Sequence, residues 1–141
     1  MLVRPIGQGS VGAVWLAKDT QLNDEPVACK VLTPTFADDR RAISDLKREV
    51  LLTRRLRHPN IVAIHSFWDA DGDRFITMEY IPGLNLAQRM KERGSPYGLA
   101  EAMPWIEQIC HALAYAHAQG ILHRDVKPAN VLLGAGGSVR L

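Results

Sequence analysis

The segment from His123 to Asn130 constrains this chain more than any other, because it crowds three kinds of polar group into one short loop. It reads His-Arg-Asp-Val-Lys-Pro-Ala-Asn. Asp125 supplies a proton acceptor, Lys127 a cation suited to phosphate, and Asn130 an amide oxygen suited to a metal ion. Each residue alone also fits an ordinary surface loop. Together they favour a site for phosphoryl transfer.

Apolar segments flank this loop on both sides. Residues 120–122 read Gly-Ile-Leu and follow a helix stop, and residues 131–133 read Val-Leu-Leu. Both segments have the composition of short strands. We therefore expect the loop to be held between two short strands. A loop of unrelated surface residues would not need such support.

The composition is that of a soluble globular domain with one core, with 141 residues, 47% of them hydrophobic and 23% charged. The net charge is +2, and the basic residues between Arg40 and Arg57 alternate with acidic ones, which favours a solvated helix face over a nucleic-acid surface. Cys29 and Cys110 lack metal-ligand spacing and are expected in the core. Without a signal peptide or an apolar run of membrane length, a cytoplasmic location is expected.

Residues 6–14 contain three glycines in the pattern G-x-G-x-x-G. The same pattern opens the helix of a dinucleotide-binding turn, but here Ala13–Lys18 is rich in strand formers. We therefore predict a strand, a glycine turn and a second strand. Glycines at such a tip let backbone N–H groups approach phosphates closely, although a plain hairpin with a glycine tip fits the same residues.

A lysine and a glutamate are each predicted on an apolar face. Val27–Leu32 reads as a short strand, and Lys30 shares a face with Ala28 and Leu32. The segment from about Asp39 to Leu56 reads as a helix capped by Asp38 or Asp39. Glu49 falls on its predicted apolar stripe, which comprises Ala42, Leu46, Leu52 and Leu56. Since a buried charge needs a partner, we predict an ion pair between Lys30 and Glu49.

The middle of the chain predicts two further strands and two helices. Strands are expected at Ile61–Trp68 and Arg74–Tyr80, joined by Asp69–Asp73 as a turn and not as a calcium loop, because the terminal glutamate of an EF-hand is missing. Leu86–Arg93 is expected to be a short helix. A longer helix is expected from about Ala100 or Pro104 to Gln119, capped by Gly120, with a core stripe of Ile106, Ile109, Leu113 and His117.

In this order, the glycine loop, Lys30, Glu49 and the loop around Asp125 resemble the eukaryotic-type serine/threonine protein kinases. The resemblance covers essentially the whole chain. It implies an α+β fold, with an antiparallel sheet and one helix in residues 1–81 and the start of a mainly helical lobe in residues 82–141. It also implies that Mg²⁺ and ATP bind and that the γ-phosphate passes to a serine or threonine hydroxyl of a protein substrate.

The resemblance further implies roles for single residues. Asp125 would accept the hydroxyl proton, Lys127 would steady the γ-phosphate, and Asn130 would hold one Mg²⁺. Lys30, held by Glu49, would contact the α- and β-phosphates. Residues implied in nucleotide binding are Ile6, Gly7, Gln8, Gly9, Ser10, Val11, Gly12, Val14, Ala28, Lys30, Met78, Glu79, Ile81 and Leu132. Asn85 falls where the family often places a ribose contact, and Arg124 where it pairs a phosphorylated activation loop.

The chain ends at Leu141, where residues 138–141 resemble the strand that leads into the metal-binding Asp-Phe-Gly segment of these kinases. We therefore expect a fragment with little activity by itself. The alternative is a non-catalytic kinase-like module that binds a partner, or a second copy, through surface that later helices would cover. A third interpretation is a broken reading frame without a stable product.

Overall fold

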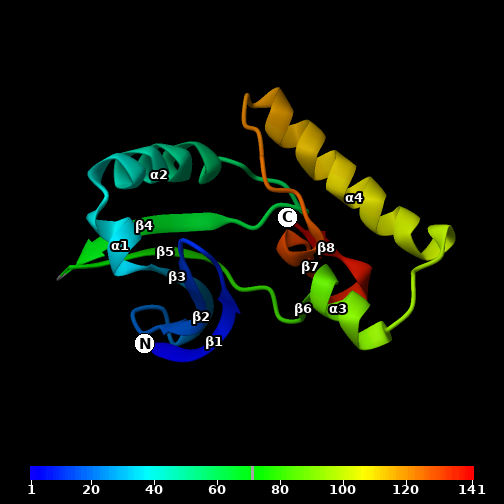
Figure 1. The fold of residues 1–141 in the computed structure, drawn as a ribbon, viewed down its shortest axis with the longest axis horizontal. Coiled ribbons are helices and arrows are strands. Elements are labelled where there is room, and N and C mark those ends of the chain that lie inside the picture. Colours follow the sequence, from blue (N-terminus) through cyan, green and yellow to red (C-terminus); the bar gives the residue numbers. More distant parts are fainter. Residues whose placement is uncertain (71) are drawn as a thin grey trace. The chain divides into compact units, whose positions relative to one another are not determined.

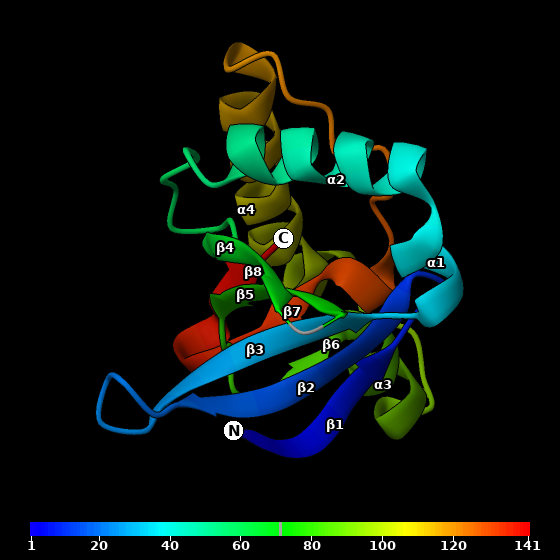
Figure 2. The same ribbon diagram turned by 90° about the vertical axis from the view of Figure 1, so that its left-hand side faces the viewer.

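The computed structural model describes residues 1–70 and 72–141, and these form two compact units (Figures 1 and 2). The first unit comprises Met1–Arg55 and Ala63–Tyr80, and the second comprises Leu56–Val62 and Ile81–Leu141. Residues 56–62, which the family resemblance implies in the first lobe, thus belong to the second unit. Within the described residues, none of the helices combines the length and the apolar character needed to span a membrane.

The first unit is built on a five-stranded antiparallel sheet. Its strand order is β1-β2-β3-β5-β4, where the strands are β1 (Leu2–Gln8), β2 (Gly12–Asp19), β3 (Glu25–Leu32), β4 (Ile64–Ala70) and β5 (Asp73–Glu79). The β1–β2 hairpin confirms the predicted strand, glycine turn and strand and excludes a dinucleotide-binding turn. The β4–β5 hairpin also confirms the predicted pair of strands, while Asp71 of the predicted connection lies outside the described residues.

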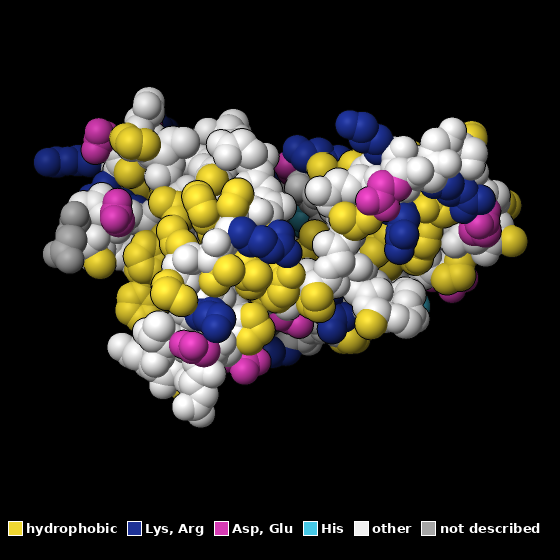
Figure 3. Space-filling view, turned by 90° about the horizontal axis from the view of Figure 1, so that it is seen from below, with side chains coloured by type: hydrophobic (Ala, Val, Ile, Leu, Met, Phe, Trp, Pro, Cys, Tyr) yellow, Lys and Arg dark blue, Asp and Glu magenta, His cyan; other side chains and the backbone are white. Residues whose placement is uncertain are grey.

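Two helices, α1 (Pro34–Asp38) and α2 (Arg40–Thr53), cover one face of this sheet (Figure 2). Asp39 caps α2, because its carboxylate accepts hydrogen bonds from the N–H groups of Arg41 and Ala42. The core lies between the helices and the sheet, where the buried side chains are Leu32, Ala37 and Ile43 and the partly buried ones Val11, Phe36, Leu46 and Phe67. Among the described residues of the first unit, no helix covers the opposite face of the sheet, and hydrophobic side chains gather there (Figure 3).

The second unit contains α3 (Leu86–Arg93), α4 (Leu99–Ala118), the 3₁₀ turns η1 (Pro128–Asn130) and η2 (Ala135–Gly137), and a small sheet of β6 (Leu84–Asn85), β7 (Leu132–Leu133) and β8 (Val139–Arg140). Both predicted helices are confirmed. Gly120 ends α4 as predicted, with a φ of +74°. Its N–H bonds the His117 carbonyl and the Ile121 N–H bonds the Ala116 carbonyl, which is a Schellman motif.

Residues 56–62 are held in the second unit by a group of hydrogen bonds around Asn60. Its side-chain amide donates to the Gln108 side chain and to the Val139 carbonyl, both at 2.8 Å. The Leu141 N–H bonds the Asn60 carbonyl, and the His58 ring lies 5.1 Å from the Tyr115 ring. This explains why a segment between α2 and β4 does not belong to the first unit.

Three expectations for the second unit are wrong. Cys110, which was expected in the core, is exposed. No strand forms at residues 120–122, because the turn after Gly120 bonds back to α4. The expected core stripe of α4 is also displaced, since Ile106 is 43% exposed and His117 is exposed. The buried side is made by small Ala112 and Ala116. Gln108 lies on the same side, where it accepts from the Val139 N–H at 2.9 Å.

Candidate functional site

The three polar residues of the 123–130 loop meet in the second unit. The Lys127 ammonium lies 2.7 Å from Oδ2 of Asp125. The Asn130 side-chain amide donates to the same oxygen at 2.9 Å and to the Asp125 main-chain carbonyl at 2.8 Å. All three side chains reach the surface, with Asp125 and Lys127 exposed. A carboxylate, a cation and an amide are thus gathered around one oxygen atom.

Local backbone geometry brings these groups together. The 3₁₀ turn η1 is closed by a bond from the Asn130 N–H to the Lys127 carbonyl, which folds Asn130 back toward Asp125. Before the turn, Arg124 has a φ of +61°, an uncommon conformation for a side chain of its kind. The next N–H, that of Asp125, bonds Nδ1 of His123 at 3.3 Å. The loop after the turn is anchored by buried Val131, whose carbonyl accepts from Leu86.

The charges around Asp125 keep its carboxylate ionised. Its pKa is lowered first by the hydrogen bond from Lys127 and next by the hydrogen bond from Asn130. The Asn130 amide nitrogen is committed to Asp125, so its Oδ1 is the atom left to act as a ligand. A neutral amide oxygen suits Mg²⁺, which at nucleotide sites takes one or two protein ligands beside phosphate and water. Among the described residues, no group of three or more His, Cys, Asp or Glu side chains is placed to hold a metal ion.

The predicted phosphate loop forms the tip of the β1–β2 hairpin in the first unit. Its three glycines differ in the room that their surroundings leave for a side chain. A Cβ at Gly12 would overlap the carbonyl oxygen of Val31 in the neighbouring strand, so this glycine is required by packing. Gly7 and Gly9 have ordinary room for a Cβ, with the nearest atoms 3.6 Å away. The loop is closed by a bond from the Gly9 N–H to the Gly12 carbonyl at 2.9 Å. Packing therefore does not explain Gly7 and Gly9.

Four predicted nucleotide-binding residues share one face of the sheet. Val14 pairs with Lys30 across β2 and β3, and Ala28, two residues before Lys30, pairs with Met78 of β5. Directly opposed residues, and residues two apart in a strand, point to the same side. Ala28 is buried and Lys30 is half-buried. The antiparallel register thus collects small, apolar and cationic side chains on one surface.

Glu79 and Ile81, whose backbones the family resemblance implies at the edge of the adenine, lie at the end of β5 and just after it. The Glu79 N–H bonds the Ala63 carbonyl at 2.9 Å, so this N–H is not left for an adenine edge. In the described part of the chain, the Ile81 N–H has no backbone partner. In the second unit, Leu132 lies half-buried in β7 and pairs with Asn85. The Asn85 side chain accepts from the Gln88 N–H and caps α3, a role that sequence reasoning missed.

The predicted ion pair between Lys30 and Glu49 does not form in this structure. Across residues 1–70 and 72–141, Glu49 has no ion-pair partner, and its side chain is exposed. The predicted stripe assumed a helix that continues to Leu56, whereas α2 ends at Thr53 and buries Ile43 and Val50. Glu49 is one residue before Val50, which turns it about 100° away from the buried side.

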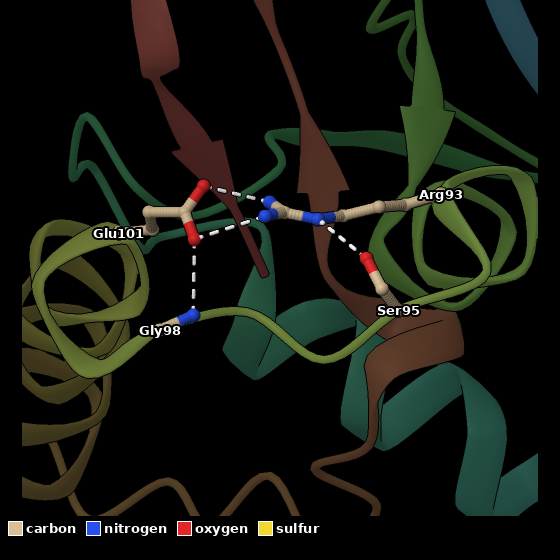
Figure 4. Close-up of polar contacts among 4 residues, drawn as sticks. All are labelled: Arg93, Ser95, Gly98 and Glu101. Carbon is tan, nitrogen blue, oxygen red and sulfur yellow. Dashed lines mark hydrogen bonds and ion pairs between the residues drawn. The ribbon is translucent and has the colours of Figure 1, made fainter.

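A second polar cluster, which sequence reasoning missed, joins α3 to α4 (Figure 4). The Arg93 guanidinium makes two parallel bonds to the Glu101 carboxylate, at 2.7 and 3.1 Å, and a third to Ser95. Glu101 also accepts from the Gly98 N–H at 3.0 Å. The bond from Arg93 lowers the pKa of Glu101, and the bond from Gly98 adds to this. Arg93 also stacks over Tyr97 at 4.2 Å, beside a hollow of about 440 Å³.

This cluster holds the 94–98 loop and carries no group aimed at a reacting atom. Both charged residues flank a Gly-Ser-Pro segment, and their separation of eight residues across a loop is not a helical spacing. No sequence pattern pointed to the pair. We therefore read it as a structural clamp between the two helices, while the loop around Asp125 remains the candidate active site.

The fold and the loop together define a class of protein. An antiparallel five-stranded sheet with a long helix on one face, followed by a helical unit that carries a His-Arg-Asp loop, is a protein-kinase-like α+β fold. Residues 1–141 match the family model described as protein kinase domain, and the chain belongs to this family.

Similar proteins agree with this assignment. The chain is 37% identical over 140 residues to a probable serine/threonine-protein kinase PknB of Lactococcus lactis, covering 99% of this chain and 22% of that protein. It is 38% identical over 140 residues to serine/threonine-protein kinase PrkC of Bacillus subtilis, covering 99% and 21%. The crystal structure of the Mycobacterium tuberculosis PknI kinase domain superposes with a TM-score of 0.85 at 34% identity, covering 99% of this chain and 57% of that one. The chain thus spans about a fifth of the curated relatives and just over half of a solved kinase domain.

Proposed function

We propose that this chain supplies the nucleotide-binding and catalytic-loop part of a serine/threonine protein kinase. The observation that carries the proposal is the cluster of Asp125, Lys127 and Asn130 around one carboxylate oxygen. Lysine two residues after the aspartate is the pattern of the serine/threonine class, and relatives of that class support the assignment.

In the proposed reaction, the substrate hydroxyl attacks the γ-phosphorus of ATP while the bond to the β-phosphate oxygen breaks and ADP leaves. Asp125 orients the hydroxyl and takes its proton, for which the carboxylate must be ionised. Its lowered pKa meets that requirement. Lys127 stands 2.7 Å from the same carboxylate and is placed to neutralise charge on the γ-phosphate. Mg²⁺, when bound at Asn130, supplies positive charge to the phosphates.

The first unit would hold the nucleotide. Gly7 and Gly9 have no packing reason to be glycine, which fits a backbone that approaches phosphates closely. Val14 and Ala28 offer an apolar surface for a base, and Lys30 on the same face offers a cation for the phosphates. Pairing Lys30 with Glu49 would require α2 to turn about its axis, because Glu49 is exposed.

The test measures Mg·ATP binding and phosphoryl transfer separately on the 141-residue chain. Saturable binding of a fluorescent ATP analogue that requires Mg²⁺ is expected, and Lys30→Met should weaken it by about tenfold. Transfer of labelled phosphate to a generic serine/threonine substrate should be slow and should fall by at least about a hundredfold with Asp125→Asn.

Asp38→Asn is the matched control, because Asp38 is also exposed and has no ion-pair partner within residues 1–70 and 72–141. It should change neither binding nor transfer. Failure of the chain to bind Mg·ATP at millimolar concentration would overturn the proposal.

Binding without transfer would support the alternative, a non-catalytic kinase-like module that binds a protein partner. Two observations favour this second candidate: the Lys30 and Glu49 side chains do not meet, and α4 exposes the apolar residues Leu99, Met103 and Ile106. Concentration-dependent self-association, or a stable complex with a protein that binds α4, would distinguish it from a kinase fragment that is merely slow.

A further inference from the structure

The solvent face of α2 carries a row of arginines that the proposed kinase chemistry does not use. Arg41, Arg48 and Arg55 recur every seven residues, and all three are exposed. Seven residues are close to two helical turns, so such residues lie almost in line. The turn continues past the end of α2, because the Arg55 N–H bonds the Leu52 carbonyl. The row therefore runs about 21 Å along the helix, with neighbouring arginines about 10.5 Å apart.

Two leucines lie within this row. Leu51 is 56% exposed and Leu52 is 46% exposed, although α2 buries Ile43 and Val50 on its other side. At 100° per residue, Leu51 and Leu52 lie on either side of the line through Arg48. Because α2 already packs its other face, these two leucines leave apolar surface in contact with water. A partner protein would cover that apolar surface.

The charge of this face is not balanced by the fold. Across residues 1–70 and 72–141, Arg41, Arg48 and Arg55 make no ion pair. Asp45 lies on the same face and offsets a single charge, and the exposed Glu49 lies further round the helix, about 100° from Arg48. By contrast, Lys47 points toward the sheet, where it contacts the Phe67 ring at 4.9 Å and Asp69 at 3.8 Å. Three cations therefore face solvent beside one anion and two leucines.

We propose that this face, Arg41-Arg48-Leu51-Leu52-Arg55, binds an acidic amphipathic helix of a partner protein. A partner helix aligned with α2 presents carboxylates seven residues apart at the same spacing of about 10.5 Å, and leucine-like side chains between them cover Leu51 and Leu52. Arginine also suits paired carboxylates by geometry. An anionic membrane is disfavoured, since an interfacial helix needs a wide apolar face and this one has two leucines and a carboxylate.

The probe is a labelled synthetic helix of about five turns, with leucines along one side and glutamates flanking them at seven-residue spacing. Its binding to the 141-residue chain is followed by fluorescence anisotropy. Saturable binding is expected, and it should weaken strongly as salt rises from about 50 to 500 mM. Arg48→Glu should weaken binding about fivefold. Replacing both leucines, Leu51→Ser with Leu52→Ser, should weaken it about tenfold.

Exchanging the charges of the probe and the chain tests whether Arg48 contacts the probe or only affects the structure of the chain. A probe with lysines in place of the glutamates should bind the Arg48→Glu variant better than it binds the original chain, while Arg48→Lys should keep most of the affinity for the acidic probe. Lys91→Glu, an equal charge change at an exposed residue of α3, is the control and should change affinity less than twofold.

Three outcomes would overturn the proposal. They are the absence of saturable binding by the acidic helix, equal weakening by Lys91→Glu and Arg48→Glu, and tighter binding to anionic phospholipid vesicles than to the peptide.

Discussion

The charged residues of the two units differ in how far they are organised. In the second unit, Asp125, Lys127 and Asn130 bond one another directly, whereas in the first unit Lys30 and Glu49 do not meet. Asp125 and Asn130 are five residues apart and are joined by one 3₁₀ turn, so local backbone geometry sets their distance. The distance between Lys30 and Glu49 depends on how α2 is rotated on the sheet. Local geometry thus brought the loop residues together, whereas the contact predicted between the distant residues Lys30 and Glu49 does not form.

The largest expected effect concerns the glycines of the first unit. Gly12→Ala should destabilise the chain by about 2 kcal/mol, because the new methyl group would overlap the backbone of Val31. Gly9→Ala should be within about 1 kcal/mol of neutral, since its neighbours leave ordinary room. Urea denaturation of both variants checks this. Equal losses of stability would show that packing does not distinguish the two glycines.

The effect expected next in size is a change in the pKa of Asp125. Lys127→Met removes the main cause of its lowered pKa, so the pKa should rise toward the ordinary value, while the Asn130 bond keeps part of the shift. Carbon-detected NMR of the carboxylate measures this directly. Because the folded pKa lies below the unfolded one, the stabilising contribution is complete above the unfolded pKa. It is lost as the pH falls through the folded pKa.

The same titration tests whether the charged residues of the second unit are better organised than those of the first. If the Asp125 pKa did not move in the Lys127→Met variant, the contact at 2.7 Å would not be held in solution, and the second unit would be no better organised than the first. Lys91→Met is a suitable control, because it removes an exposed lysine without an ion-pair partner in the described part of the chain.

The smallest effect is expected for Glu49→Gln. The carboxylate is exposed and makes no ion pair with a described residue, so removing its charge should change the free energy of unfolding by less than about 0.5 kcal/mol. Thermal unfolding of the chain without nucleotide checks this. A loss above about 1 kcal/mol would mean that Glu49 pairs with Lys30 in solution and that the two units are equally organised.

Much of the fold could be predicted because its signals are local. The strand formers after the glycine turn predicted the β1–β2 hairpin, and Asp39 and Gly120 were predicted at the helix ends where they stand. The His-Arg-Asp loop was predicted as a site from eight consecutive residues, and its three polar groups do meet. What failed was the choice of buried side for α2 and α4.

The buried side of α4 escaped prediction because it is not made of large apolar residues. Ala112 and Ala116 allow close approach, and Gln108 bonds the backbone around Val139. A pattern of large apolar residues at helical spacing gives no weight to small residues. It also gives none to a glutamine whose side chain hydrogen-bonds backbone groups in place of water. It therefore favoured Ile106, which is 43% exposed.

Sequence alone was enough to predict the family, the order of the elements and the residues of the loop around Asp125, because each depends on residues close together in the chain. Three other features follow from packing in three dimensions: Gly12 is required by the Val31 backbone, residues 56–62 join the second unit, and Glu49 faces solvent. These outcomes depend on the packing of segments far apart in the sequence, where small differences in helix length or rotation decide which side chains meet.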